Sequence, residues 1–335
     1  MLPEQATTDN RSPPMHSRLS QNDVTNLVNV EDASQVRDAI IAMYSARYPG
    51  ADLANLARAF DDVKALFEGN YPGYLPCDTL YHDSRHTFDM TLAMARLVEG
   101  HDRACPAAEQ LGARRAVLGV VIALLHDSGY MRRASEVAVE NGAVFTKVHV
   151  SRSADFLARY LPTIGYGPEA EMASRVVHFT GYEMDLDEIQ VARPHERMLG
   201  WMVGTADLIG QMSDRMYLEK CRDFLYAEFV WANIARERFA DGQELVRYAS
   251  AADLMVKTPG FYEHVARARI EKKLGGADRF AEAHFDGPNP YQSEIERNIA
   301  FLRQLVEAAE LGRLRRLCYS LSTRPASRPA SALSA

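Results

Sequence analysis

Apolar residues recur at three- and four-residue spacing along most of this chain, which is the period of an amphipathic helix. Ala, Leu, Met, Arg and Glu dominate the long segments, and no segment keeps the alternation of a half-buried strand. Pro and Gly separate many of these segments, as in Tyr71-Pro-Gly73 and Thr258-Pro-Gly260. The pattern predicts helices over residues 32–47, 51–67, 84–99, 107–126, 149–160, 168–179, 195–211, 214–238, 243–255, 260–273 and 289–318. We therefore predict an all-α protein.

The two ends of the chain differ from the middle. Residues 1–30 are polar and contain Pro13-Pro14, which predicts a disordered, mobile leader, and residues 321–335 are rich in Pro, Ala and Ser, which predicts a disordered tail. No linker between them is long enough to separate two cores, so residues 31–320 are predicted to form one helical domain. Residues 129–148 are the least regular interior stretch, and we expect them to form a lid or one wall of a site.

Composition excludes several classes of function. The 335 residues carry a formal net charge of −7 and no basic cluster that would suit nucleic acid. Four scattered cysteines without C-x-x-C spacing are typical of reduced thiols rather than of a disulfide framework or a zinc ribbon. No apolar run approaches the roughly 20 residues that cross a bilayer, and the N-terminus lacks the pattern of a signal peptide. We therefore expect a cytoplasmic protein that binds neither nucleic acid nor membrane.

The dipeptide His126-Asp127 ends the apolar run of residues 116–125, so a buried segment delivers an imidazole and a carboxylate together. Further histidines and one carboxylate lie in or beside other helix-like segments: His82, His86, His149, His178 and Asp207. His82 and His86 are four residues apart and share a face if both are helical. Asp207 has apolar neighbours, and a carboxylate buried among them requires a partner or a metal. This series predicts a metal site assembled from several helices.

The order His, His-Asp, Asp on consecutive helices resembles the HD-domain superfamily of metal-dependent phosphohydrolases. The stretch Tyr81-His-Asp-Ser-Arg-His-Thr-Phe-Asp-Met90 is also similar to the Y-H-N-x-x-H-x-x-D-V signature of class I cyclic-nucleotide phosphodiesterases and their bacterial relatives. The resemblance implies a single-domain HD-type helical bundle with its metal-site core at about residues 80–210 and flanking helices at 214–318. It implies four ligands for a first metal, His86, His126, Asp127 and Asp207. It further implies that His82 acts as proton donor, that Asp127 bridges to a second metal, and that His149 and His178 complete a binuclear site.

The chemistry implied is hydrolysis of a small, cyclic-nucleotide-like phosphoester. Two divalent ions clamp the phosphate and activate a bridging hydroxide, with Asp127 between them, while His82 protonates the leaving oxygen. Mixed His and carboxylate ligation suits Fe, Mn, Zn, Co or Ni, with Mg also compatible with the second position. Three cations beside the ligand series are candidate phosphate contacts: Arg85, Lys147 and Arg152.

The chain departs from relatives of this type at two places. Asp83 stands where the phosphodiesterases usually have Asn, and His178-Phe-Thr-Gly-Tyr-Glu183 replaces the H-H-E and G-Y-P elements of the HD-GYP cyclic-di-GMP enzymes. Two other functions stay open, a mixed-valent di-iron HD-fold oxygenase and a non-catalytic nucleotide-binding HD sensor. A homodimer built by residues 214–318 is compatible with any of them.

Overall fold

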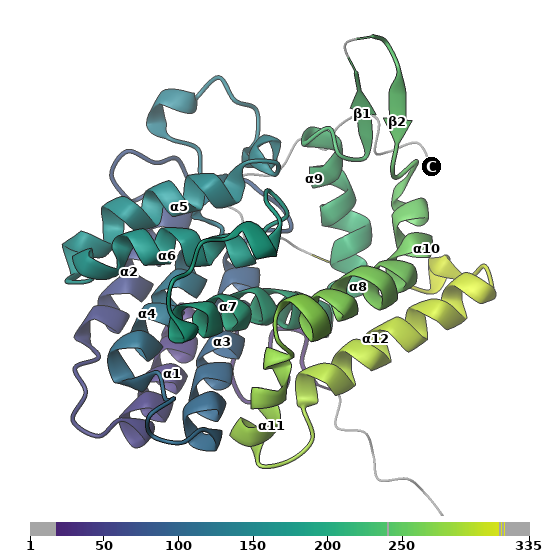
Figure 1. The fold of residues 1–335 in the computed structure, drawn as a ribbon. Helices are drawn as coiled ribbons and strands as arrows, with labels where there is room; N and C mark the ends of the chain where they lie inside the picture. The colour runs from purple at the N-terminus through teal and green to yellow at the C-terminus, as the bar shows by residue number, and fades with distance from the viewer. Residues whose placement is uncertain (1–17, 240, 315, 317, 319–335) are drawn as a thin grey trace, which may run out of the picture.

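The computed structural model describes residues 18–239, 241–314, 316 and 318 and is mostly helical, as Figure 1 shows, so the all-α prediction is confirmed. The helices are α1 Ala33–Arg47, α2 Ala54–Glu68, α3 Ser84–Ala104, α4 Gly112–Leu125, α5 His149–Tyr160, α6 Ala170–Val176, α7 Pro194–Ser213, α8 Tyr217–Lys220, α9 Tyr226–Trp231, α10 Ala251–Phe261, α11 Phe280–Phe285 and α12 Pro290–Glu307. A small antiparallel hairpin pairs β1 Arg236–Arg238 with β2 Glu244–Val246 and projects from the helical body above α9 and α10 (Figure 1).

Helix α3 forms the centre of the packing. It contacts α1, α4, α7 and α11, and most of its residues are buried on all sides. The neighbouring α4 is almost entirely apolar, which fits a helix surrounded by others. Among the described residues, no helix is both long and apolar enough to cross a membrane. The helices α3, α4 and α7 pack against one another, and predicted ligands lie on α3, directly after α4 and on α7.

The C-terminal half differs most from the predicted elements. The predicted helix 214–238 instead consists of α8, a π-helical turn at Cys221–Leu225 and α9, and residues 236–246 form the hairpin, so helix predictions there are wrong. The predicted break at Thr258-Pro-Gly260 is also wrong. The chain stays helical through α10 and continues beyond it in π-helical turns as far as Lys273. The proline lies inside the helix, and the first π-helical turn, Tyr262–Ala266, begins three residues after it.

Residues 18–30, predicted to belong to a mobile leader, instead pack on the helices. Asp23 is fully buried and forms a 2.6 Å ion pair with Arg96 of α3. Arg18 lies 3.3 Å from Glu294 of α12 and donates a hydrogen bond to the Ser213 carbonyl oxygen. The leader prediction therefore fails for these residues, while residues 1–17 and the predicted tail 321–335 lie outside the described part of the chain.

Asp89 on α3 makes stability depend on pH. Its Oδ1 atom is buried and has no hydrogen-bond partner among the described residues. Burial, followed by the nearby charge of Asp214, raises the pKa of Asp89 to about 7. The unfolded carboxyl ionises near pH 4. The contribution of neutral Asp89 to the free energy of unfolding is therefore fully present below about pH 4, and up to about 4 kcal/mol of it is lost as the pH rises through about 7.

We expect Asp89→Asn to raise the free energy of unfolding at about pH 8 by up to about 4 kcal/mol and to leave it nearly unchanged near pH 4. The neutral amide cannot ionise, so it avoids the cost of the buried charge. Urea denaturation between about pH 4 and 8 measures this difference. An equal effect of the substitution at every pH would contradict the assignment.

Candidate metal centre

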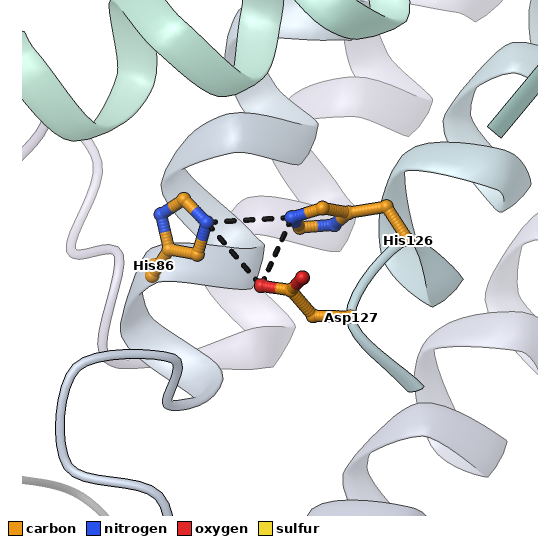
Figure 2. Close-up of side chains that lie close together, drawn as sticks. All are labelled: His86, His126 and Asp127. Atoms are coloured by element: carbon orange, nitrogen blue, oxygen red, sulfur yellow. Dashed lines mark hydrogen bonds and ion pairs between the residues drawn. The ribbon is translucent and has the colours of Figure 1, made fainter. Parts of the chain in front are cut away.

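His86, His126 and Asp127 converge in the interior, each offering one ligand atom within 4.8 Å of the others (Figure 2). Nε2 of His86 lies 3.3 Å from Nε2 of His126 and 3.4 Å from Oδ2 of Asp127. Nε2 of His126 lies 3.1 Å from the same carboxylate oxygen. All three residues are buried, so bulk water does not screen this cluster.

Asp207 brings a fourth ligand atom to this cluster from α7. Its Oδ1 lies 3.2 Å from Nε2 of His86 and 3.7 Å from Nε2 of His126. Nε2 of His149, at the start of α5, lies 3.7 Å from the second carboxylate oxygen of Asp127. The structure thus gathers five of the six predicted ligands, four around one point and His149 on the far side of Asp127.

Local backbone contacts fix the direction of these side chains. The carboxylate of Asp83 accepts a hydrogen bond from the backbone N–H of His86 at 3.1 Å, which caps α3. Nδ1–H of His126 donates to the Ala123 carbonyl oxygen at 2.7 Å, and Nδ1–H of His149 donates to the Thr146 carbonyl oxygen at 2.7 Å. With the proton on Nδ1, the neutral form of each ring has a bare Nε2 that faces the cluster.

The spacing of the ligand atoms of His86, His126 and Asp127 fits a bound cation. Ligand atoms held about 2.1 Å from an ion lie about 3.0 Å apart in octahedral and about 3.4 Å apart in tetrahedral coordination. The three distances among these atoms are 3.1–3.4 Å, and Oδ1 of Asp207 lies 3.2 and 3.7 Å from the two imidazole nitrogens. Oδ2 of Asp127 is buried without a hydrogen-bond partner among the described residues. One N–H on His86 can point at only one of its three acceptors, whereas a cation can contact every lone pair at once.

Charge in the cluster shifts the pKa values of its members. Burial lowers the pKa of His126, but the charge of Asp127 outweighs it and raises the pKa to about 9. Burial tends to raise the pKa of Asp127, and the facing histidines, His126 first, hold it far below its usual range. Burial lowers the pKa of His149. The cluster therefore favours positive charge next to the Asp127 carboxylate.

His82 lies beside the cluster and has a different partner. Its Nδ1 lies 2.5 Å from Oε2 of Glu228 on α9, and Oε1 of Glu228 accepts the backbone N–H of Tyr81 at 2.6 Å. Burial lowers the pKa of His82, but the charge and hydrogen bond of Glu228 outweigh it and raise the pKa. Glu228 thus holds a proton on Nδ1 and leaves Nε2 as the free end of the ring.

His178 is the predicted ligand that the structure does not bring into the group. Its Nδ1 is buried without a hydrogen-bond partner among the described residues, and burial lowers its pKa. Glu183, five residues later, accepts the backbone N–H groups of Val150 and Ser151 at 2.7 and 3.0 Å. Glu183 therefore caps the start of α5 and supports His149 from behind.

The three predicted phosphate contacts all pair with other groups. Arg85 is buried between Glu31 and Asp214, at 3.1 and 2.8 Å. Lys147 is half-exposed and pairs with Glu237 of β1 at 2.9 Å. Arg152 donates to Glu136 and to backbone carbonyl oxygens of the turn that follows Asp127. Each of the three cations is therefore held by carboxylates or backbone carbonyl oxygens of the framework.

Glu228 and Tyr130 adjoin the site but were not predicted from the sequence. The sequence could have indicated Glu228, because this carboxylate lies within the aromatic run Phe224-Leu-Tyr-Ala-Glu-Phe-Val-Trp231 and a charge among apolar residues needs a partner. The same argument selected Asp207. Its partner, 146 residues away, was not visible in the pattern. Tyr130 had no signal beyond its position three residues after Asp127.

Comparison with known protein families, with curated proteins and with solved structures finds no match to this chain. The assignment of the site therefore depends on its own geometry.

Gly129 allows the turn after Asp127 to touch α5. A Cβ atom at this position would lie 1.8 Å from the carbonyl oxygen of His149. The Gly129 N–H also donates to Ser153 Oγ at 2.8 Å. The turn and the start of α5 are therefore in backbone contact.

We expect Gly129→Ala to lower the free energy of unfolding by about 3 kcal/mol, because the backbone of α5 has to move. Chemical denaturation measures the change. Gly167→Ala is the matched control, since its Cβ meets only ordinary contacts at 3.7 Å or more, and we expect a change of no more than about 0.5 kcal/mol. Equal stability of the two variants would contradict the close approach.

Proposed function

We propose that this protein is a metal-dependent phosphohydrolase with an HD-type site in a single helical domain. The reaction is hydrolysis of a small phosphodiester, with a cyclic nucleotide as the leading substrate class. One observation carries the proposal: the ligand atoms of His86, His126 and Asp127 lie at the spacing of a coordination shell, with Asp207 beside the two imidazoles.

The same four residues would hold the first ion. Oδ2 of Asp127 faces the first site, and Oδ1 of Asp127 faces Nε2 of His149. Oδ1 and this Nε2 would therefore form part of a second site. His178 remains a predicted member of the second site. When bound, divalent transition-metal ions would supply Lewis acidity toward the phosphoryl oxygens and acidify a water molecule.

Residues of the protein exclude bulk water from the site and supply a proton to the leaving group. The three most buried ligands keep bulk water away, while the side chains of His82, His149 and Asp207 are 16%, 15% and 13% exposed and mark the side from which substrate approaches. His82 donates a proton from Nε2 to the leaving oxygen as the P–O bond breaks. Glu228 holds Nδ1–H throughout and stabilises the positive charge that His82 carries before transfer.

The His82–Glu228 pair favours hydrolysis over the two other functions. Departure of an alkoxide needs a positioned acid, whereas oxygen activation at a di-iron pair has no such need. A sensor that only binds nucleotide has no need of a complete ligand shell together with an acid. A buried Glu oriented toward one histidine therefore fits an esterase-type reaction best.

The decisive experiment combines metal analysis with turnover. Purified protein is loaded separately with Mn, Fe, Co, Ni or Zn and assayed on bis-p-nitrophenyl phosphate and on a panel of cyclic nucleotides. We expect hydrolysis that depends on the metal and disappears with a chelator. Bound iron with oxygen uptake and no phosphate ester cleavage would refute the proposal in favour of the di-iron oxygenase.

A further inference from the structure

Tyr130 contacts both histidines that lie outside the four-ligand group. Its ring centroid lies 4.4 Å from that of His82 and 4.4 Å from that of His149, with ring planes 20° apart in each pair. The centroids of the two imidazoles are 6.2 Å apart. The three rings thus form a compact triangle with Tyr130 in contact with both partners.

The hydroxyl group of Tyr130 adds a polar contact to this packing. It lies 3.5 Å from Nε2 of His82. Nδ1–H of His82 donates to Glu228, so Nε2 is the ring nitrogen that faces the Tyr130 hydroxyl; it accepts from this hydroxyl when His82 is neutral and donates to it when His82 is protonated. The two contacts hold opposite ends of one imidazole.

The position of Tyr130 is itself tightly fixed. It ends the 3₁₀ turn Ser128–Tyr130, which begins directly after Asp127, and its N–H donates to the Asp127 carbonyl oxygen at 3.0 Å. Its side chain is 1% exposed. The short connection to the metal-ligand dipeptide gives the ring little freedom to move independently of Asp127.

We propose that Tyr130 is a positioning residue that orients His82 as proton donor and His149 as ligand through ring stacking and one hydrogen bond. This inference rests on the proposed function, because it assigns the two histidines their roles in that reaction. One side chain thereby ties the orientation of the acid to the orientation of the second metal's ligand.

Two substitutions separate the ring from the hydroxyl. Tyr130→Phe keeps the stacking surface and removes the donor, whereas Tyr130→Leu removes both. We expect Tyr130→Leu to lower kcat on a cyclic nucleotide about 10²-fold with little change in KM, as for a misplaced catalytic group. We expect Tyr130→Phe to lower it less than about 10-fold, because the ring still holds both imidazoles.

A spectroscopic readout keeps this test independent of turnover. Two-bond ¹H–¹⁵N spectra of histidine-labelled, full-length protein, metal-free and zinc-loaded, report which ring nitrogen of His82 carries the proton. We expect one fixed Nδ1–H form in the wild type, a shifted Nε2 resonance in Tyr130→Phe and averaged ring signals in Tyr130→Leu. Tyr44→Leu is the matched control, since Tyr44 is a fully buried tyrosine on α1. We expect it to reduce stability without moving the His82 signals.

The outcomes separate this inference from the proposed function. Unchanged His82 signals in both Tyr130 variants would overturn the positioning role, whatever the turnover. Averaged His82 signals in Tyr130→Leu, in a protein that hydrolyses no phosphodiester, would support the positioning role and refute the proposed function. If Tyr130→Leu does not fold, the Nε2 shift in Tyr130→Phe decides, and its absence overturns the inference.

Discussion

Asp127→Ala is expected to abolish binding of the first ion and to reduce phosphodiester hydrolysis by at least about 10³-fold, close to the background rate. Asp127 faces His86 and His126 with one oxygen and His149 with the other, so its loss damages both proposed ion positions. Metal ions supply several kcal/mol of transition-state stabilisation, and each 1.36 kcal/mol is about tenfold in rate. Elemental analysis of the purified variant and its turnover on bis-p-nitrophenyl phosphate measure the two effects.

Asp89→Asn is the matched control, because it also removes a buried carboxylate, three residues after the proposed ligand His86 on α3. We expect it to retain the metal content of the wild type and its turnover on the same substrate. Circular dichroism checks that Asp127→Ala keeps its helices. If folded Asp127→Ala binds metal and turns over like the wild type, the cluster is not the catalytic centre.

Glu228→Gln is expected to lower kcat by about 10²–10³-fold on substrates with an alkoxide leaving group while leaving the metal content unchanged. The neutral amide no longer stabilises a positive charge on His82, so the ring holds its proton less well. A cyclic nucleotide releases a poor leaving group that needs this proton. A p-nitrophenyl ester releases a stable anion, so its turnover is expected to fall less than tenfold. The ratio of the two rates is the diagnostic quantity.

Two further variants test whether Glu228 acts through His82. His82→Ala is expected to give the same change in this ratio, and the double variant is expected to add little, because the residues act as a unit. Glu219→Gln is the control, since it removes a buried carboxylate that pairs with Arg316 instead. An additive loss in the double variant would contradict the linkage between Glu228 and His82.

The helices that hold the cluster were the easiest to predict. The apolar run before His126 is the periodic signal of a buried helix, and it ends where α4 ends, at Leu125. Asp207 was selected because a charge among apolar neighbours has to be compensated. These inferences needed only local sequence, and the structure places their residues together.

The hairpin and the partner of His82 depend on information that a local pattern lacks. The hairpin has a turn signal in Asp241-Gly242, but charged residues such as Arg236 and Glu244 flank it in place of apolar ones, so its composition resembles an exposed helix. Arg85 was selected for its position near two histidines, yet tertiary packing gives it to Asp214. The partner of a charged side chain depends on contacts between residues far apart in the sequence, and the spacing of residues along the chain does not predict these contacts.

The depth of the four-ligand group also bears on how fast an ion could be exchanged. Its members come from α3, from the residues directly after α4 and from α7, and the least accessible of them is 1% exposed. An ion held there is accessible only from the side of Asp207, because the other three ligands are 4% exposed or less, so local opening of the surrounding interior would speed its release. The same atoms are far apart in the unfolded chain, so each bound ion also favours the folded state by mass action. The half-life of a bound ion in excess chelator would then report on local opening around the site.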